Sequence, residues 1–196
     1  MVHNDEVVAP GTGFETHPHQ DLEIVTWVLR GALVHQDSEG HSGVVYPGLA
    51  QRMSAGSGIQ HSERNDAGEA VRYVQMWVRP DEVDLDPSYQ QAEVGDSLAT
   101  GELVPIASGL PKHEQTAAIR IHQREAGLYA ARLSPGQAVH LPTAPYVHLF
   151  VALGTVSLEG AGDLSTADAA RVVASDGQRV TAGPGGAEVL VWEMLA

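Results

Sequence analysis

The sequence predicts an all-β protein made of two antiparallel domains of the sandwich or barrel type. Its apolar segments are short and rich in Val, Ile, Tyr and Trp, as in Glu23 to Leu29, Val71 to Val78 and Val189 to Trp192, which is the composition of strands. Turn signals with Gly or Pro separate them, for example Pro47-Gly48 and Ser134-Pro135-Gly136. Their spacing is typical of antiparallel sandwiches and barrels. No long stretch shows strong helical periodicity.

The segment from Pro80 to Ser97 differs in composition from the strands around it. It contains several acidic residues, two prolines and few apolar residues, which is typical of a connection. We therefore predict an N-terminal domain over residues 1–95 and a C-terminal domain over residues 96–196. A short internal match favours two similar halves, because Ile24 to Val34 aligns with Val147 to Ser157.

The amino-acid composition disfavours some binding partners and excludes some kinds of metal site. The chain has 25 acidic and 11 basic residues, a formal net charge of -14, which disfavours direct binding to nucleic acid or to anionic membranes. It has no cysteine, so a metal would need nitrogen and oxygen ligands. We find neither a secretion signal nor an apolar run long enough to cross a membrane, and we expect a cytoplasmic protein.

Two pairs of residues have the spacing of metal ligands. His17 and His19 stand two apart, so in a strand both side chains point to the same face, with Cα atoms roughly 6–7 Å apart. His61 and Glu63 repeat this spacing. If the pairs face each other, three nitrogens and one oxygen can bind one divalent transition metal. The internal match puts Pro142 opposite His19, so we expect the second half to lack a metal site.

Incidental histidines are the alternative, because a lone His-x-His pair is weak evidence in a chain with 10 histidines. The other histidines lack a nearby His-x-Glu or lie beside polar or turn residues. We expect His35, His41, His113 and His122 to be surface or structural side chains, and we expect no metal at His140 or His148 in the second half.

Two motifs carry a family resemblance. The run from Gly11 to Gly31 (GTGFETHPHQDLEIVTWVLRG) is similar to the first cupin motif, and Met53 to Asn65 (MSAGSGIQHSERN) is similar to the second. More narrowly, the H-P-H followed by E-I-V-T, together with M-x-A-G-x-G-I-x-H-S-E, resembles the pirin family of the cupin superfamily. That family includes bacterial members described as quercetin 2,3-dioxygenases.

The resemblance implies a double cupin, that is, two antiparallel β-sandwich or jelly-roll barrels. It implies His17, His19, His61 and Glu63 as metal ligands in the N-terminal cupin domain, and a degenerate C-terminal one. In general cupins the first-motif glutamate, here Glu23, is a ligand. In pirins that role passes to Glu63, so we expect Glu23 beside the ligands or on a strand face. Members of the family usually carry a longer N-terminal segment, which leaves open whether N-terminal strands are missing here.

The resemblance also implies an activity. It points to a metal-dependent dioxygenase that acts on quercetin or a related small aromatic flavonol, with Glu63 as ligand and proton acceptor. Fe(II) is the first choice of metal, with Mn, Ni, Cu or Zn as alternatives, because this ligand set does not discriminate among them. The alternative function is a metal-binding regulatory protein that acts through a protein partner.

Overall fold

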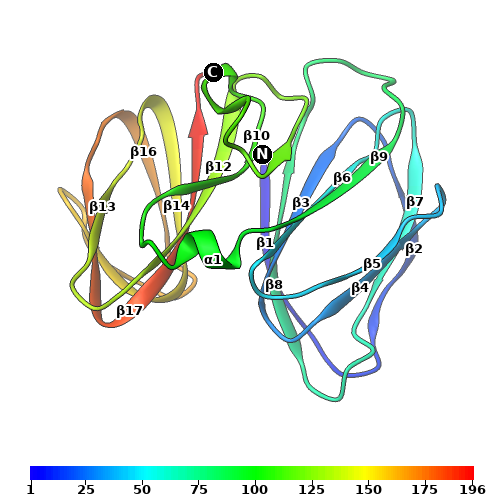
Figure 1. The fold of residues 1–196 in the computed structure, drawn as a ribbon, viewed down its shortest axis with the longest axis horizontal. Helices are drawn as coiled ribbons and strands as arrows, with labels where there is room; N and C mark the ends of the chain where they lie inside the picture. Colours follow the sequence, from blue (N-terminus) through cyan, green and yellow to red (C-terminus); the bar gives the residue numbers. More distant parts are fainter. The chain divides into compact units, whose positions relative to one another are not determined.

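The computed structural model describes residues 1 to 196, which divide into two compact units. Unit 1 contains Met1–Gly95 and Ala118–Arg124, and unit 2 contains Asp96–Ala117 and Glu125–Ala196. Strands make up nearly all of the regular structure (Figure 1). The prediction of an all-β antiparallel protein is therefore confirmed. No helix in the structure has the length and apolar character needed to span a membrane.

Unit 1 is a sandwich of two antiparallel sheets. Its strands are β1 (Val2–Val8), β2 (Gly13–His19), β3 (Glu23–Arg30), β4 (Leu33–Asp37), β5 (Ser42–Val45), β6 (Leu49–Ser54), β7 (Ile59–Arg64), β8 (Val71–Val78), β9 (Ser88–Glu93) and β11 (Ile119–Arg120). One sheet has the order β1-β8-β3-β6-β9, and the other has the order β2-β7-β4-β5. Figure 1 shows these sheets as two layers.

The core of unit 1 lies between these layers. One cluster joins Val28 on β3 and Tyr73 on β8 to Leu33 on β4. A second joins Ile24 on β3 to Ile59 on β7. Each fully buried side chain of this size contributes about 1.5–3 kcal/mol, so these clusters fix how the β2-β7-β4-β5 sheet lies on its partner.

Unit 2 is a second antiparallel β structure. Its elements are β10 (Val104–Ser108), a 3-10 helix (Pro111–His113), β12 (Ala126–Leu133), β13 (Ala138–His140), β14 (Thr143–Leu158), β15 (Gly162–Ser165), β16 (Ala169–Asp176) and β17 (Arg179–Met194), preceded by the short helix α1 (Gly95–Leu98). The main order is β10-β12-β17-β14-β15, with β13 paired to β17 and β16 to β14. Leu149 and Val151 on β14 pair with Val191 and Val189 on β17, and all four are in the apolar core.

A buried carboxylate ties the segment Ala118–Arg124 to unit 1. Glu23 is 1% exposed. One of its oxygens accepts hydrogen bonds from Ser54 Oγ at 2.7 Å and His122 Nδ1 at 3.1 Å, and the other accepts the backbone N–H of His122 at 3.1 Å. Arg52, also buried, donates to Ser54 and Ser88 and supplies a compensating positive charge. Glu23 is thus engaged in anchoring the chain and belongs to neither potential metal-binding group.

Asn65 closes the loop that follows β7. Its side-chain amide is fully buried. Nδ2 donates to the carbonyls of Val8 at 2.9 Å and Glu69 at 2.8 Å, while Oδ1 accepts the N–H of Ala67 at 3.1 Å. The Asn65 amide thus satisfies backbone groups both in its own loop and at the end of β1.

Replacing Asn65 by alanine should lower the free energy of unfolding by about 2–3 kcal/mol, because buried backbone groups would lose their partners. Urea unfolding followed by circular dichroism measures the change. Asp66→Ala is the control, since Asp66 is exposed and should shift the value by no more than about 0.5 kcal/mol. Equal effects of the two substitutions would contradict the role assigned to the Asn65 amide.

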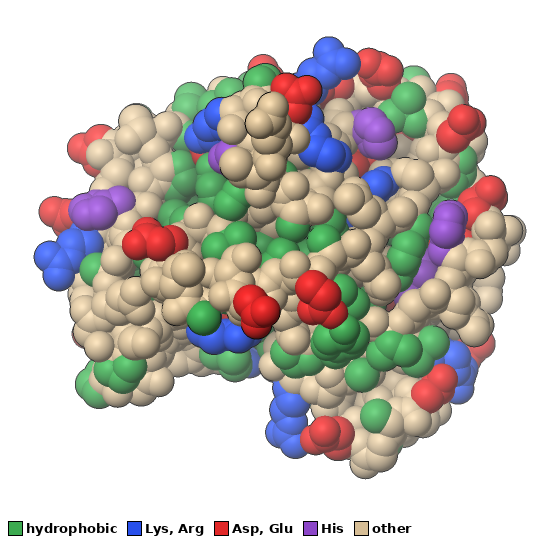
Figure 2. Space-filling model, viewed as in Figure 1, with side chains coloured by type: hydrophobic (Ala, Val, Ile, Leu, Met, Phe, Trp, Pro, Cys, Tyr) green, Lys and Arg blue, Asp and Glu red, His purple; other side chains and the backbone are tan.

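The charge of the chain is dispersed on the face drawn in Figure 2. Acidic and basic side chains lie there singly or in small mixed groups, without a continuous basic area. An exposed ion pair of this kind joins Arg30 and Glu69 at 3.1 Å. The absence of direct nucleic-acid binding stays a prediction.

Candidate metal centre

The central strand of the site is β7, with β2 on one side and β4 on the other. Side chains along β7 alternate, so Ile59, His61 and Glu63 are buried while Gln60 is exposed. This alternation puts His61 and Glu63 on the same face, inside the sandwich. The spacing of these two residues therefore predicts correctly that their side chains share one face of β7.

The register of β2 on β7 brings the His17/His19 pair next to the His61/Glu63 pair. His17 lies directly across from His61, and His19 lies across from Ile59. The register shifts between Phe14 and His17, which marks a bulge. Because β2 is an edge strand, Pro18 can lie in it without breaking a ladder on its outer side.

Gly13 allows β2 to approach β7. A Cβ atom at this position would lie 2.2 Å from the backbone oxygen of Glu63. Any larger residue would therefore push β2 away from the strand that carries His61. The glycine in the G-T-G segment is explained by this close approach.

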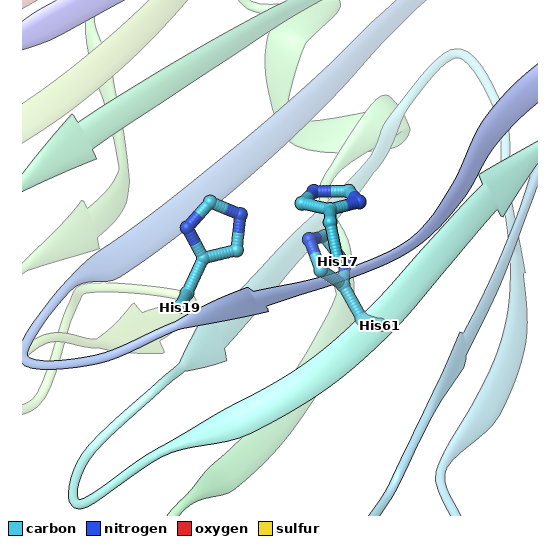
Figure 3. Close-up of side chains that lie close together, drawn as sticks. All are labelled: His17, His19 and His61. Atoms are coloured by element: carbon cyan, nitrogen blue, oxygen red, sulfur yellow. The ribbon is translucent and has the colours of Figure 1, made fainter.

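Three imidazoles converge at the centre of the site (Figure 3). The ring centroids of His17, His19 and His61 are 4.4–5.0 Å apart, and one nitrogen of each lies within 4.8 Å of the others. His19 Nε2 and both nitrogens of His61 are buried without a hydrogen-bond partner. His17 Nδ1 lies 2.8 Å from the carbonyl of Glu15, so Nδ1–H can donate to it and leave Nε2 free for a ligand.

Glu63 lies beside this trio but belongs to a second group of potential ligands. Its carboxylate is within 4.8 Å of nitrogens of His61 and His35, and all three residues are buried. Gln75 Nε2 donates to Glu63 Oε1 at 2.7 Å. Trp77 Nε1 donates to Gln75 Oε1 at 3.0 Å, which orients the amide so that its NH2 group points at Glu63. The structure therefore brings the four predicted residues into two overlapping groups that share His61.

Burial sets the protonation states of the site. It lowers the pKa of His61 to about 3, with the neighbouring His17 and His35 adding to the effect. It also lowers the pKa of His19. Burial raises the pKa of Glu63 to about 7, although the hydrogen bond from Gln75 opposes this. A buried imidazole such as His61, which is neutral at pH 7 and lacks hydrogen-bond partners, suits a divalent cation, so this His/Glu cluster could bind a metal.

Metal binding should release a proton from Glu63 in a pH-dependent way. With a pKa of about 7, Glu63 is mostly protonated near pH 6 and ionised near pH 8. A metal ion that uses this carboxylate competes with that proton, so affinity should weaken as the pH falls through about 7. The wild-type protein should release about one more proton than Glu63→Gln near pH 6, and about the same number near pH 8. Calorimetric titration with Ni(II) in buffers of different ionisation enthalpy measures the number of protons released. If the wild-type protein and Glu63→Gln released equal numbers of protons at both pH values, Glu63 would be excluded from the ligand set.

Some residues of the site were not identified from the sequence. His35 was expected at the surface or in a structural role, yet it is 1% exposed and groups with His61 and Glu63. Its H-x-D spacing with Asp37 repeats the pattern of the two ligand pairs, and that signal could have identified it. Gln75 and Trp77 carry no comparable signal. His113 is structural as expected, since it bonds to Ser108 and Tyr129.

A pocket adjoins His19. It has a volume of about 450 Å³ and is lined by His19 with Pro18, Gln20, Ser38, Gly58, Ile59 and Gln60. This volume lies in the usual range for small-molecule sites of about 300–1,000 Å³. Trp77 packs edge-on against His19, with ring centroids 5.1 Å apart, and limits the movement of that ring.

Comparisons with known proteins agree with this architecture. Residues 1–78 match the family model described as Pirin, and residues 106–194 match the model described as Quercetinase C-terminal cupin domain. A protein of Mycobacterium tuberculosis named "Putative quercetin 2,3-dioxygenase" is 56% identical over 197 residues, which cover 100% of this chain and 80% of the relative. An Escherichia coli K12 protein named quercetin 2,3-dioxygenase is 39% identical over 160 residues, covering 80% of this chain and 66% of that protein.

Solved structures give the same result. YhhW from Escherichia coli is similar with a TM-score of 0.86 and 32% identity, over 98% of this chain and 80% of that one. Another structure of this bacterial pirin, in complex with nickel(II), has a TM-score of 0.85 and 32% identity, over 98% and 81% of the two chains. Sequence, fold and the intact His/Glu cluster agree, and the chain belongs to the pirin family of cupin proteins.

Proposed function

We propose that this protein is a metal-dependent dioxygenase that acts on quercetin or a related flavonol. The observation that carries the proposal is the convergence of three imidazoles with free nitrogens beside a carboxyl group whose pKa is about 7. The names of the mycobacterial and Escherichia coli relatives support this substrate class.

His17, His19, His61 and Glu63 would hold a single divalent ion, with Fe(II) as the first candidate and Mn, Ni, Cu or Zn as alternatives. The donor set fits, because His61 has two buried nitrogens without partners and first-row ions accept mixed imidazole and carboxylate ligands. When bound, such an ion supplies a Lewis acid that can bring together a substrate oxygen and dioxygen.

Glu63 is the residue we assign to proton transfer. A positioned carboxylate can act as a general base towards a substrate hydroxyl, and Glu63 is buried within the His/Glu cluster. Gln75 fixes Oε1, so Oε2 is the oxygen that would accept the proton. In that step the O–H bond of the substrate hydroxyl breaks, a carboxyl O–H bond forms, and the substrate becomes an anion that dioxygen can oxidise.

The test combines metal content with oxygen uptake. The purified wild-type protein, His61→Ala and Glu63→Gln are reconstituted with Fe(II), Mn(II), Ni(II) or Cu(II), analysed for metal, and assayed with quercetin in an oxygen electrode. We expect one metal per wild-type chain and equal molar losses of oxygen and quercetin. His61→Ala should lose both metal and activity, whereas Glu63→Gln should turn over at least about 100-fold more slowly even when metal-loaded.

Two other outcomes would change this proposal. Metal without oxygen uptake would overturn the dioxygenase assignment and favour the regulatory alternative, in which the metal controls contact with a protein partner. Absence of bound metal in the wild-type protein under every reconstitution would overturn the metal centre itself.

A further inference from the structure

His35 is a buried histidine with one nitrogen fixed and the other free. Its Nε2 lies 3.2 Å from Asp37 Oδ2. Because an ionised carboxylate can only accept hydrogen bonds, the ring proton lies on Nε2 and the lone pair on Nδ1. That Nδ1 is buried and has no hydrogen-bond partner. A lone pair in this condition is costly unless a ligand or proton meets it.

Asp37 is held in place as an anion. Its side chain is fully buried, and it accepts the backbone N–H groups of Glu39 at 3.0 Å and His41 at 2.9 Å, besides His41 Nδ1 at 3.0 Å. Burial alone would raise the pKa of Asp37, but the hydrogen bonds from His41 and His35 outweigh it and lower the pKa. A histidine that donates one N–H to such a carboxylate has its tautomer fixed and its other nitrogen made more basic, as in metal-binding histidines generally.

The ring of His35 lies beside the potential ligands of the site. In the ladder between β4 and β7, His35 is opposite Glu63 and Asp37 is opposite His61. The donor atoms of His35, His61 and Glu63 lie within 4.8 Å of one another, and the rings of His35 and His61 are 5.3 Å apart. These three residues form a second group of potential ligands. Its member His35 comes from β4, on one side of β7, whereas His17 and His19 come from β2, on the other side.

Packing does not account for this arrangement of His35. Tyr89 stacks on the ring, with centroids 4.9 Å apart and an angle of 28°, which fixes the ring plane. A stacked ring supplies no donor to Nδ1. Purely structural histidines of this chain, such as His113, have both nitrogens bonded.

We propose that the centre has two neighbouring cation positions, an outer one formed by the four residues His17, His19, His61 and Glu63 and an inner one formed by His35, His61 and Glu63. One ion can occupy either position, because His61 belongs to both. Asp37 is a positioning residue that keeps His35 in the tautomer that can bind. This inference extends the proposed metal centre, and its test requires no catalytic activity.

The test removes the outer position and asks whether the inner one remains. A His17→Ala/His19→Ala variant of the full chain is titrated with Co(II), whose visible absorption reports coordination geometry. We expect one Co(II) per chain, bound about 10–100-fold more weakly than by the wild-type protein. Adding His35→Gln to this variant should abolish binding. Adding Asp37→Asn should weaken it a further 10–100-fold, because an amide can donate to Nε2 and move the proton to Nδ1.

His140→Gln in the same background is the matched control, because His140 is exposed and bonds to the carbonyl of Gly177. It should leave Co(II) binding unchanged. Circular dichroism must show that every variant is folded. The inner position is disproved if the folded double variant binds no Co(II), or if His35→Gln has no effect on its binding. Failure of the wild-type protein to consume oxygen would end the dioxygenase proposal and leave this result untouched.

Discussion

His61→Ala should bind Ni(II) more than 100-fold more weakly than the wild-type protein and still fold. Losing even a supporting partner of a metal ligand costs about 10–100-fold in affinity, and His61 contributes to both groups of potential ligands. Equilibrium dialysis with elemental analysis measures the loss.

Folding should survive because two opposing effects nearly cancel. Alanine leaves a cavity, but it also removes two buried nitrogens that lack partners in the metal-free protein, and each such group costs about 1–3 kcal/mol. The metal-free variant should therefore unfold within about 1 kcal/mol of the metal-free wild type. His140→Ala serves as control for binding. Stoichiometric Ni(II) in folded His61→Ala would place the metal elsewhere.

Glu23→Ala should lower the free energy of unfolding by about 3–5 kcal/mol. The buried guanidinium of Arg52 is linked to Glu23 through the hydroxyl of Ser54, and removing one of two neighbouring opposite charges in the interior leaves the other uncompensated. The substitution also removes both hydrogen bonds to His122. Chemical unfolding measures the loss, and limited proteolysis should detect early cleavage within Ala118–Arg124.

Glu69→Ala is the matched control for that substitution. Glu69 also pairs with an arginine, Arg30, but both side chains are more than half exposed, and exposed pairs contribute only about 0–1 kcal/mol. Similar destabilisation by the two substitutions would show that the anchoring role assigned to Glu23 is wrong.

The sequence predicted the features of the site that depend on neighbouring residues. The alternation of side chains along a strand is a local property, so the spacing of His17 with His19 and of His61 with Glu63 predicted which side chains share a face. Glu23 was expected beside the predicted ligands or on a strand face; it belongs to neither potential metal-binding group and bonds to Ser54 and His122.

Contacts between distant segments could not be predicted from the sequence. His35 meets Glu63 through the register of β4 on β7, and Gln75 reaches Glu63 from β8 in the other sheet. Register depends on how whole strands pair, which one sequence does not specify. The return of Ala118–Arg124 to unit 1 depends on a carboxylate 99 residues earlier in the chain. No pattern in the composition of either segment signals that pairing.

The edge position of β2 has a consequence for how the centre is reached. His17 and His19 lie on a strand with a hydrogen-bonded neighbour on one side only, whereas His61 and His35 lie on strands paired on both sides. Local opening free energies are lowest where a segment has few buried contacts and few ladder bonds, and the first four residues of β2 are exposed. Two of the four residues proposed for the outer position therefore lie on an edge strand that is held by a single ladder. We therefore expect ions to enter and leave the proposed site by transient separation of β2 from β7, without global unfolding of the sandwich.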